Sequence, residues 1–278
     1  MQYVALFACL TMCLLVGGLM HAILRPAYSY RLVRVIAAPG MVVRKLSMSM
    51  AALLTGATLT QVNIYRLKEQ EIGFQGDGPS AAAKALAPVA PLFACALALQ
   101  SVNAVLGSPV NDLTFNISSL GAEGPRGFLL GLWGLMSDLV AQFLKADWRS
   151  LRLYFLLVFL FSFSFGACVP LNRFREALIG AGIIAAALAA GASLLGTQSG
   201  LFTLPFGSVP GSPASRFAQN AEDRLIALGG AAVVMMFGGM IAAILLSLVV
   251  RIFEMVGKAT GGAKGGEGGG KSEKRAAA

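Results

Sequence analysis

Few residues in this chain carry the side chains that catalysis or metal binding requires. His21 is the only histidine, and the four cysteines, Cys9, Cys13, Cys95 and Cys168, lie inside apolar stretches without a CxxC spacing. A histidine-based zinc site needs several such ligands, and a Ser-His-Asp arrangement needs a histidine beside its nucleophile. We therefore expect the cysteines to pack as small buried hydrophobes, and we expect His21 to be an interfacial residue at a helix end.

Asp138 is the one carboxylate that lies well inside an apolar run, in the stretch 127–144. A charge in hydrocarbon is costly, so such a residue either carries protons or ions or pairs with another helix. We favour a hydrogen bond from Asp138 to a neighbouring helix. A proton or cation path that uses Asp138 and the proline-broken turns near Pro88 and Pro91 stays open.

Two adjacent cations, Arg44 and Lys45, also lie close to an apolar stretch. In the middle of a bilayer they would mark a functional pathway, whereas near the surface their long side chains reach the head groups. We favour the head-group interpretation, because Arg31 and Arg34 fall on the same side of the first predicted crossing.

The composition assigns these residues to a membrane protein. Hydrophobic residues make up 56% of the chain and charged residues 13%, and the mean hydropathy is +0.73, which is far outside the range of soluble proteins. A crossing needs about 20 apolar residues, and seven stretches come close to this length: 2–20, 42–59, 81–106, 127–144, 153–169, 177–195 and 225–250.

We therefore predict an all-α polytopic membrane protein with six to seven transmembrane helices. Residues 1–257 form a single membrane-embedded domain, and 258–278 form a flexible, basic, Gly-rich tail. The net charge of +9 comes from Lys and Arg at helix ends and in the tail, which orients the chain with its tail in the cytoplasm. It indicates no nucleic-acid partner.

The stretch from Pro39 to Phe74 contains the clearest change of pattern along the chain. Pro39 and Gly40 predict a break before a helix over 42–59. Residues 60–65 alternate between apolar and polar, which is typical of a strand. A charged turn then leads to a second extended piece over 72–74, so a small β-hairpin is predicted after the second helix.

Three segments carry a resemblance to a known family. They are PGMVVRKLSMSMAALLTGATLTQVNIY (39–65), LAPVAPLF (86–93) and DWRSLRLYFLLVFLFSFSFGACVPLNRFREALIG (147–180). Their order, over about 1–196, resembles that of the site-2 protease family of intramembrane zinc metalloproteases in its shorter bacterial form. That family carries PG-x-x-x-H-E-x-x-H-A, then an apolar stretch ending in TGA, then a strand. The resemblance implies two zinc-binding histidines and a general-base glutamate in the first segment, and an aspartate ligand after a proline in the third.

The residues that this resemblance requires for catalysis are replaced. Arg44 and Met48 stand at the two histidine positions, and Lys45 stands at the glutamate position. No aspartate follows Pro170 within the next four residues. Because zinc hydrolysis needs about three protein ligands and a proton-accepting carboxylate, we predict a catalytically dead member with neither zinc nor another cofactor.

The leading hypothesis is a non-catalytic membrane subunit, a pseudoprotease scaffold in the bacterial inner membrane. Its expected partners are lipids and other integral membrane subunits of a larger complex. The expected contact residues are small side chains at helical spacing and the polar side of the strand: Ser47, Ala51, Thr55, Gln61, Asn63 and Tyr65. Two alternatives stay open: a peptide-binding module that adds a strand along 60–65, and a transporter that uses Asp138.

The chain purified from membranes should contain no stoichiometric zinc, because Arg44 and Lys45 would repel the ion that the family's residues bind. Inductively coupled plasma mass spectrometry on protein purified without chelator measures the zinc content per chain. A value near one zinc per chain would overturn the loss of the metal site.

Overall fold

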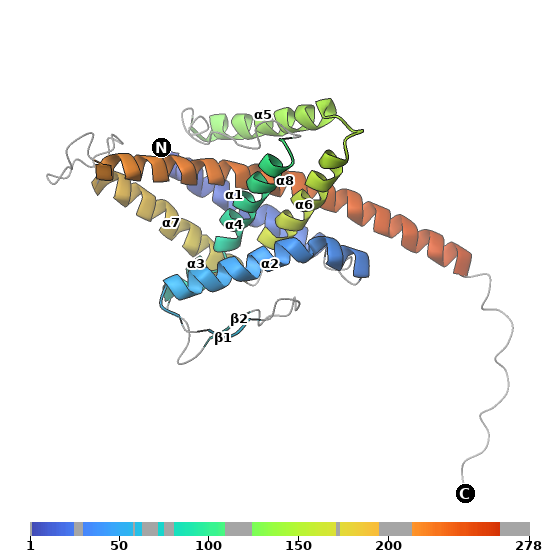
Figure 1. Cartoon of the computed structure of the whole chain (residues 1–278), viewed down its shortest axis with the longest axis horizontal. Coiled ribbons are helices and arrows are strands. Elements are labelled where there is room, and N and C mark those ends of the chain that lie inside the picture. Colours follow the sequence, from blue (N-terminus) through green and yellow to red (C-terminus); the bar gives the residue numbers. More distant parts are fainter. Residues whose placement is uncertain are drawn as a thin grey trace, which may run out of the picture.

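The computed structural model describes residues 2–24, 30–57, 59–62, 72–74, 81–108, 124–170, 173–194 and 213–261. This part of the chain is mostly helical (Figure 1). The elements in chain order are α1 (Gln2–Leu24), α2 (Arg31–Leu54), β1 (Leu59–Val62), β2 (Ile72–Phe74), α3 (Ala81–Leu86), α4 (Ala90–Val105), α5 (Gly124–Lys145), α6 (Leu151–Ala167), α7 (Phe174–Leu194) and α8 (Pro213–Gly261).

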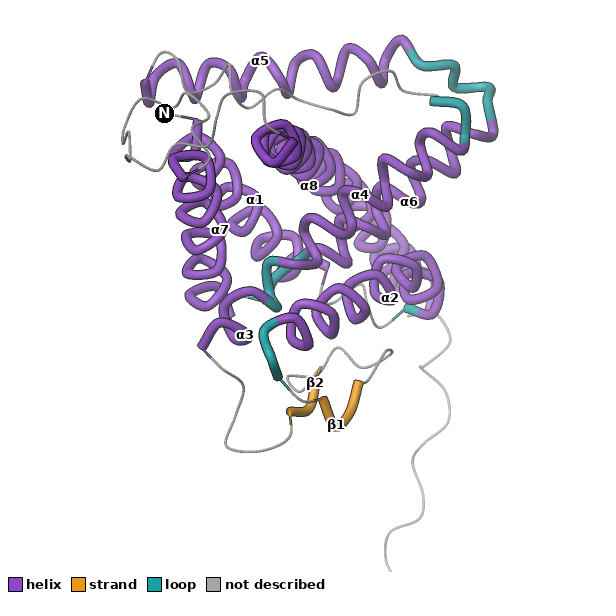
Figure 2. Tube along the Cα trace, turned by 60° about the vertical axis from the view of Figure 1, so that its left-hand side comes forward, coloured by secondary structure: helices purple, strands orange, loops and turns teal. Residues whose placement is uncertain are grey.

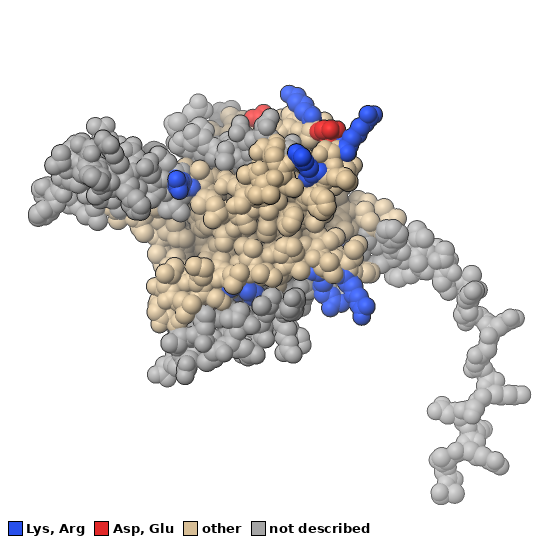
Figure 3. Space-filling model, viewed as in Figure 1, with Lys and Arg blue, Asp and Glu red and all other residues tan. Residues whose placement is uncertain are grey.

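Three helices, α1, α2 and α8, are long and apolar enough to cross a membrane, and α4 and α6 are shorter apolar helices. This agrees with the predicted class of a helical membrane protein, while the count of six to seven crossings stays a prediction. In Figure 3 the charged side chains lie mainly along two opposite edges of the visible face, and the band between them is largely uncharged. Such a band is what a hydrocarbon environment requires.

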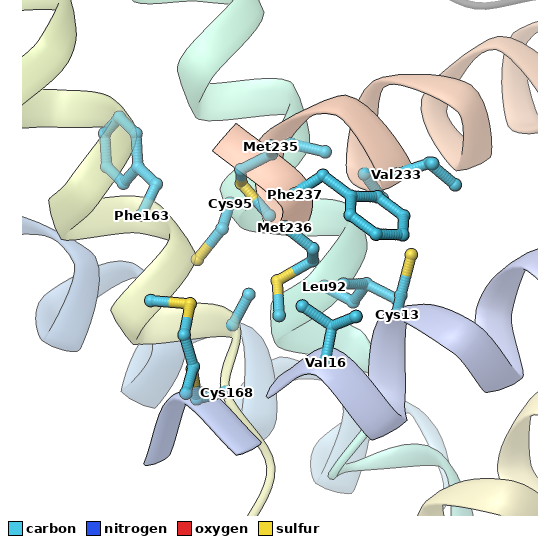
Figure 4. Close-up of a cluster of buried hydrophobic side chains, with 14 of the residues drawn as sticks. Cys13, Val16, Leu92, Cys95, Phe163, Cys168, Val233, Met235, Met236 and Phe237 are labelled. Atoms are coloured by element: carbon cyan, nitrogen blue, oxygen red, sulfur yellow. The ribbon is translucent and has the colours of Figure 1, made fainter. Parts of the chain in front are cut away.

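Helix α6 lies at the centre of the helical assembly and packs against α2, α4 and α8. Residues 160–169, which form its second half and the two residues after it, are all buried. Phenylalanines alternate there with Ser and Gly, so large side chains fill the core and small ones let neighbouring helices approach closely. Figure 4 shows the core beside it, where side chains of α1, α4 and α8 meet Phe163 and Cys168. All four cysteines are buried and free, which confirms their predicted role as packed hydrophobes.

Helix α2 runs without a break through Pro39, so the predicted break at Pro39 and Gly40 is wrong. A proline inside a helix removes a backbone donor and crowds the preceding turn. Next to the proline, the Gly40 N–H donates to the Ser162 hydroxyl of α6 at 2.8 Å. This contact ties α2 to α6 at the position where the local sequence favours a break.

Two glycines end their helices and explain why these stop early. Gly56 has a φ of +80°, the Gly56 N–H donates to the Leu53 carbonyl, and the Ala57 N–H donates to the Ala52 carbonyl. Gly107, with a φ of +79°, ends α4 by the same pattern. This is the Schellman arrangement, which glycine adopts without steric cost. The predicted helix end at residue 59 was therefore too late.

The predicted single span over 81–106 is two helices. Residues 87–89 form a turn between α3 and α4, and Pro91 lies in the first turn of α4, where proline is tolerated. The turn that contains Pro88 thus interrupts the predicted span. Helix α7 packs closely against α3 beside this turn, because a Cβ on Gly180 would overlap the Ala85 carbonyl.

Helix α8 is longer than predicted at both ends, and the predicted tail boundary at 258 falls inside it. Its 49 residues span about 70 Å at 1.5 Å per residue, more than twice the roughly 30 Å hydrocarbon core of a bilayer. Its C-terminal part projects away from the other helices (Figure 1).

The short strands β1 and β2 pair antiparallel, with Val62 opposite Ile72 and Leu59 opposite Phe74. Both lie where the sequence predicts extended segments. The connecting residues 63–71 lie outside the described part of the chain, so the hairpin as a whole stays a prediction.

The Gly40→Ala variant should be less stable by about 1–3 kcal/mol, because overpacking a close helix contact forces the backbones apart. A Cβ on Gly40 would overlap the Ser162 carbonyl. Thermal unfolding in detergent measures the effect. The matched control is Gly134→Ala on α5, where a Cβ would meet nothing within 4 Å; it should be neutral or up to about 1 kcal/mol more stable. Equal stability of Gly40→Ala and the parent chain would contradict the tight crossing.

Candidate functional site

The candidate site is the junction between the middle of α2 and the C-terminal end of α6. The guanidinium of Arg44 donates from Nη1 to the Gly166 carbonyl at 3.1 Å, and the same nitrogen donates to the Cys168 carbonyl. Arg44 is only 5% exposed. The last carbonyls of a helix have no partners within the helix, and a cation there interacts favourably with the helix dipole, so Arg44 acts as a buried cap on α6.

The close approach of the two helices makes this cap possible. A Cβ on Gly166 would overlap the backbone of Gly40, so the two glycines let α2 and α6 touch along their backbones. Gly40 and Arg44 are four residues apart on α2 and therefore lie on one face. The crossing at Gly40 places Arg44 opposite the last turn of α6.

Lys45 and Met48 are buried on the same side of α2, each about 1% exposed. The outward face of α2 carries large apolar side chains instead, namely Leu32, Val35, Leu46, Met50, Leu53 and Leu54. From residue 41 onward, the two cations of α2 are buried while large apolar side chains are exposed, which is the reverse of a helix on the surface of a soluble protein. It is expected where the outside is lipid, because intramembrane charges face the protein interior.

The predicted head-group location of Arg44 and Lys45 is therefore wrong. Both side chains point into the protein, because the carbonyls at the end of α6 need a donor and because lipid favours the apolar face of α2 on the outside. The sequence contained a signal for Arg44, since it lies on the face of α2 opposite Leu46 and Leu53. The Gly166 and Cys168 carbonyls that bind Arg44 give no such signal in the sequence.

The structure brings together two of the segments that carry the family resemblance. Arg44 of the first segment contacts the Gly166–Cys168 backbone of the third, just before Pro170. Residues 171–172 lie outside the described part. The residues at this junction do not fit zinc: Arg44 and Lys45 are cations, and the described residues include no group of three His, Cys, Asp or Glu side chains that could hold a metal.

The expected contact residues of α2 lie beside the α6 interface. Ser47, Ala51 and Thr55 are each partly exposed, and the Ser47 and Thr55 hydroxyls donate to carbonyls of their own helix. The face of α2 that packs closely against α6 is the one that carries Gly40 and Arg44. The Gln61 side chain, and Asn63 and Tyr65 altogether, lie outside the described part of the structure, so their contacts stay predictions.

The other chemistry-bearing residues lie away from this junction. Asp138 is exposed on α5, so the predicted hydrogen bond inside the helical assembly is wrong, and its exposed position gives no support to a proton path. Asp138 is exposed because α5 lies across the end of the helical assembly and not between its helices (Figure 2). His21 lies partly exposed in the last turn of α1, where a cation is favourable.

Comparison of this chain with protein-family models, with curated proteins and with solved structures finds no match.

The Arg44→Met variant should be less stable by about 1–3 kcal/mol, the cost of leaving a buried acceptor without its donor. The Arg44→Lys variant keeps the charge but loses the fork of donors, so it should recover part of this loss. Thermal unfolding in detergent measures both. The control is Arg31→Gln, an exposed position on the same helix, which should change stability by less than about 0.5 kcal/mol. An Arg44→Met protein as stable as this control would rule out the cap.

Proposed function

We propose that this chain is a non-catalytic integral membrane subunit, a pseudoprotease scaffold that packs with other membrane subunits of a larger complex. The proposal places it in a bacterial inner membrane, with six to seven crossings and the tail in the cytoplasm. The scaffold role is inferred from the resemblance to site-2 proteases, and the loss of catalysis is inferred from the residues at their catalytic positions, Arg44, Lys45 and Met48.

The observation that carries the proposal is the hydrogen bonding of Arg44. In the aligned family position a histidine binds a catalytic metal, whereas Arg44 uses its donors on the Gly166 and Cys168 carbonyls. A guanidinium stays protonated and has no acceptor, so it cannot bind a metal or take a proton as a general base. This supports a structural role for the junction.

The outer side of α2 supports the second half of the proposal, the packing with other subunits. Ser47, Ala51 and Thr55 form a row of small, partly exposed side chains at a spacing of four residues. Helices in membranes associate through such rows, because small side chains let backbones approach closely. The neighbouring Leu46 and Met50 are exposed and would flank a partner helix.

A photo-crosslinking amino acid at Ser47 or Ala51 should form adducts with a second membrane protein when the cells are irradiated before extraction. Mass spectrometry of the purified adducts identifies the protein. The control position is Ile183 on α7, an exposed apolar residue on a helix that packs against α1 and α3; it should give no such adduct. A chain that extracts alone from native membranes, with adducts at none of these positions, would remove the basis for a subunit role.

A further inference from the structure

Helix α5 lies across one end of the helical assembly, where α4 ends and α6 begins (Figures 1 and 2). Its main contact in the described structure is with α8. Among the α5 residues whose side chains the structure describes, the exposed ones are Leu130, Trp133, Ser137, Asp138, Val140, Leu144 and Lys145.

The open surface of α5 carries a regular apolar stripe. Leu130, Trp133, Val140 and Leu144 follow one another at spacings that keep them on one face of a helix, and all four are exposed, Trp133 by 76% and Leu144 by 72%. Leu132, on the opposite side, is buried in the core. The helix thus presents one apolar side to the protein and another to its surroundings.

The stripe continues into the turn that follows α5, where aromatic and basic residues alternate. Trp148 and Leu151 are exposed large hydrophobics, and Lys145, Arg149 and Arg152 are exposed in the same short stretch. Asp147 is the acidic residue among them, and its carboxylate accepts a hydrogen bond from the Arg149 N–H at 3.0 Å, which shapes the turn. Figure 3 shows charged side chains gathered at this edge of the molecule.

We propose that α5 and the turn 146–150 lie in the plane of the membrane interface, with the stripe in the acyl boundary and Lys145, Arg149 and Arg152 on anionic lipid phosphates. Tryptophan prefers this depth because it combines an apolar ring with one N–H donor. Basic residues at the surface bind anionic lipids. An in-plane helix with these two features inserts about 5–10 Å into the boundary.

This inference rests on the membrane location in the proposed function and deepens it. Of the seven stretches that the sequence offers as crossings, the one over 127–144 becomes a surface helix, and six remain. Residues 145–152 carry three basic side chains and one acidic side chain, and this net positive charge favours anionic lipid as the occupant of this surface.

The two tryptophans of this surface are the only ones in the chain, so the intrinsic fluorescence of the whole protein reports on it alone. The full chain is reconstituted into vesicles of phosphatidylcholine and phosphatidylglycerol, and one lipid is replaced by a phosphatidylcholine brominated either near the carbonyl end or near the methyl end of its acyl chains. Quenching should be stronger with bromine near the carbonyl end. Acrylamide in the water should quench weakly.

Single variants assign the depth to each site, because Trp133→Phe leaves Trp148 as the reporter and Trp148→Phe leaves Trp133. Both should show the shallow pattern. The triple variant Lys145→Gln, Arg149→Gln, Arg152→Gln should lose the dependence of Trp148 quenching on the phosphatidylglycerol content.

Three results would overturn the in-plane position. Stronger quenching by bromine near the methyl end would indicate that α5 crosses the membrane. Strong acrylamide quenching without bromolipid quenching would place the surface in water. Weak quenching by both would indicate that a protein covers it. None of these readouts depends on the crosslinks from Ser47 and Ala51, so a failure here and a failure of the subunit role can be told apart.

Discussion

The hydrogen bonds from Arg44 to the end of α6 connect most of the other features of this structure. Helix α6 ends in the interior of the protein, where residues 160–169 are buried. An unsatisfied carbonyl there would cost about 1–3 kcal/mol. The guanidinium of Arg44 supplies several donors on a rigid fork, so one side chain from α2 binds both the Gly166 and Cys168 carbonyls.

That contact depends on close approach, and the approach depends on small residues on α6. Ser162, Ser164 and Gly166 lie between the phenylalanines of its second half. Ser162 accepts the Gly40 N–H of α2, and Ser164 donates to the Met235 carbonyl of α8 at 2.7 Å. A Cβ on Gly239 of α8 would overlap the Ser164 side chain. In lipid, where the hydrophobic effect does not drive helices together, such packing and hydrogen bonds hold them.

The same contacts explain which sequence predictions were right and which were wrong. The apolar content predicted the helical class, and the apolar surroundings of the four cysteines predicted their burial, because both depend on composition alone. The break at Pro39 was wrong, since α2 continues through the proline where Gly40 packs against the Ser162 backbone of α6, a tertiary contact that local rules do not include. The predicted location of Arg44 at the head groups was wrong because the sequence showed no partner for a buried charge. The carbonyls that accept its hydrogen bonds come from 122 and 124 residues further along the chain.

The sequence by itself determined the helical class of this protein, its apolar stretches and the absence of the histidine pair that the resembling family uses. These follow from side-chain chemistry and from spacing within a few turns. Only the tertiary structure decided the role of Arg44, because that role depends on which carbonyls lie opposite its guanidinium. It also decided the placement of α5, because an apolar helix of this length has two stable environments, across a membrane or along its surface, and its neighbours select between them.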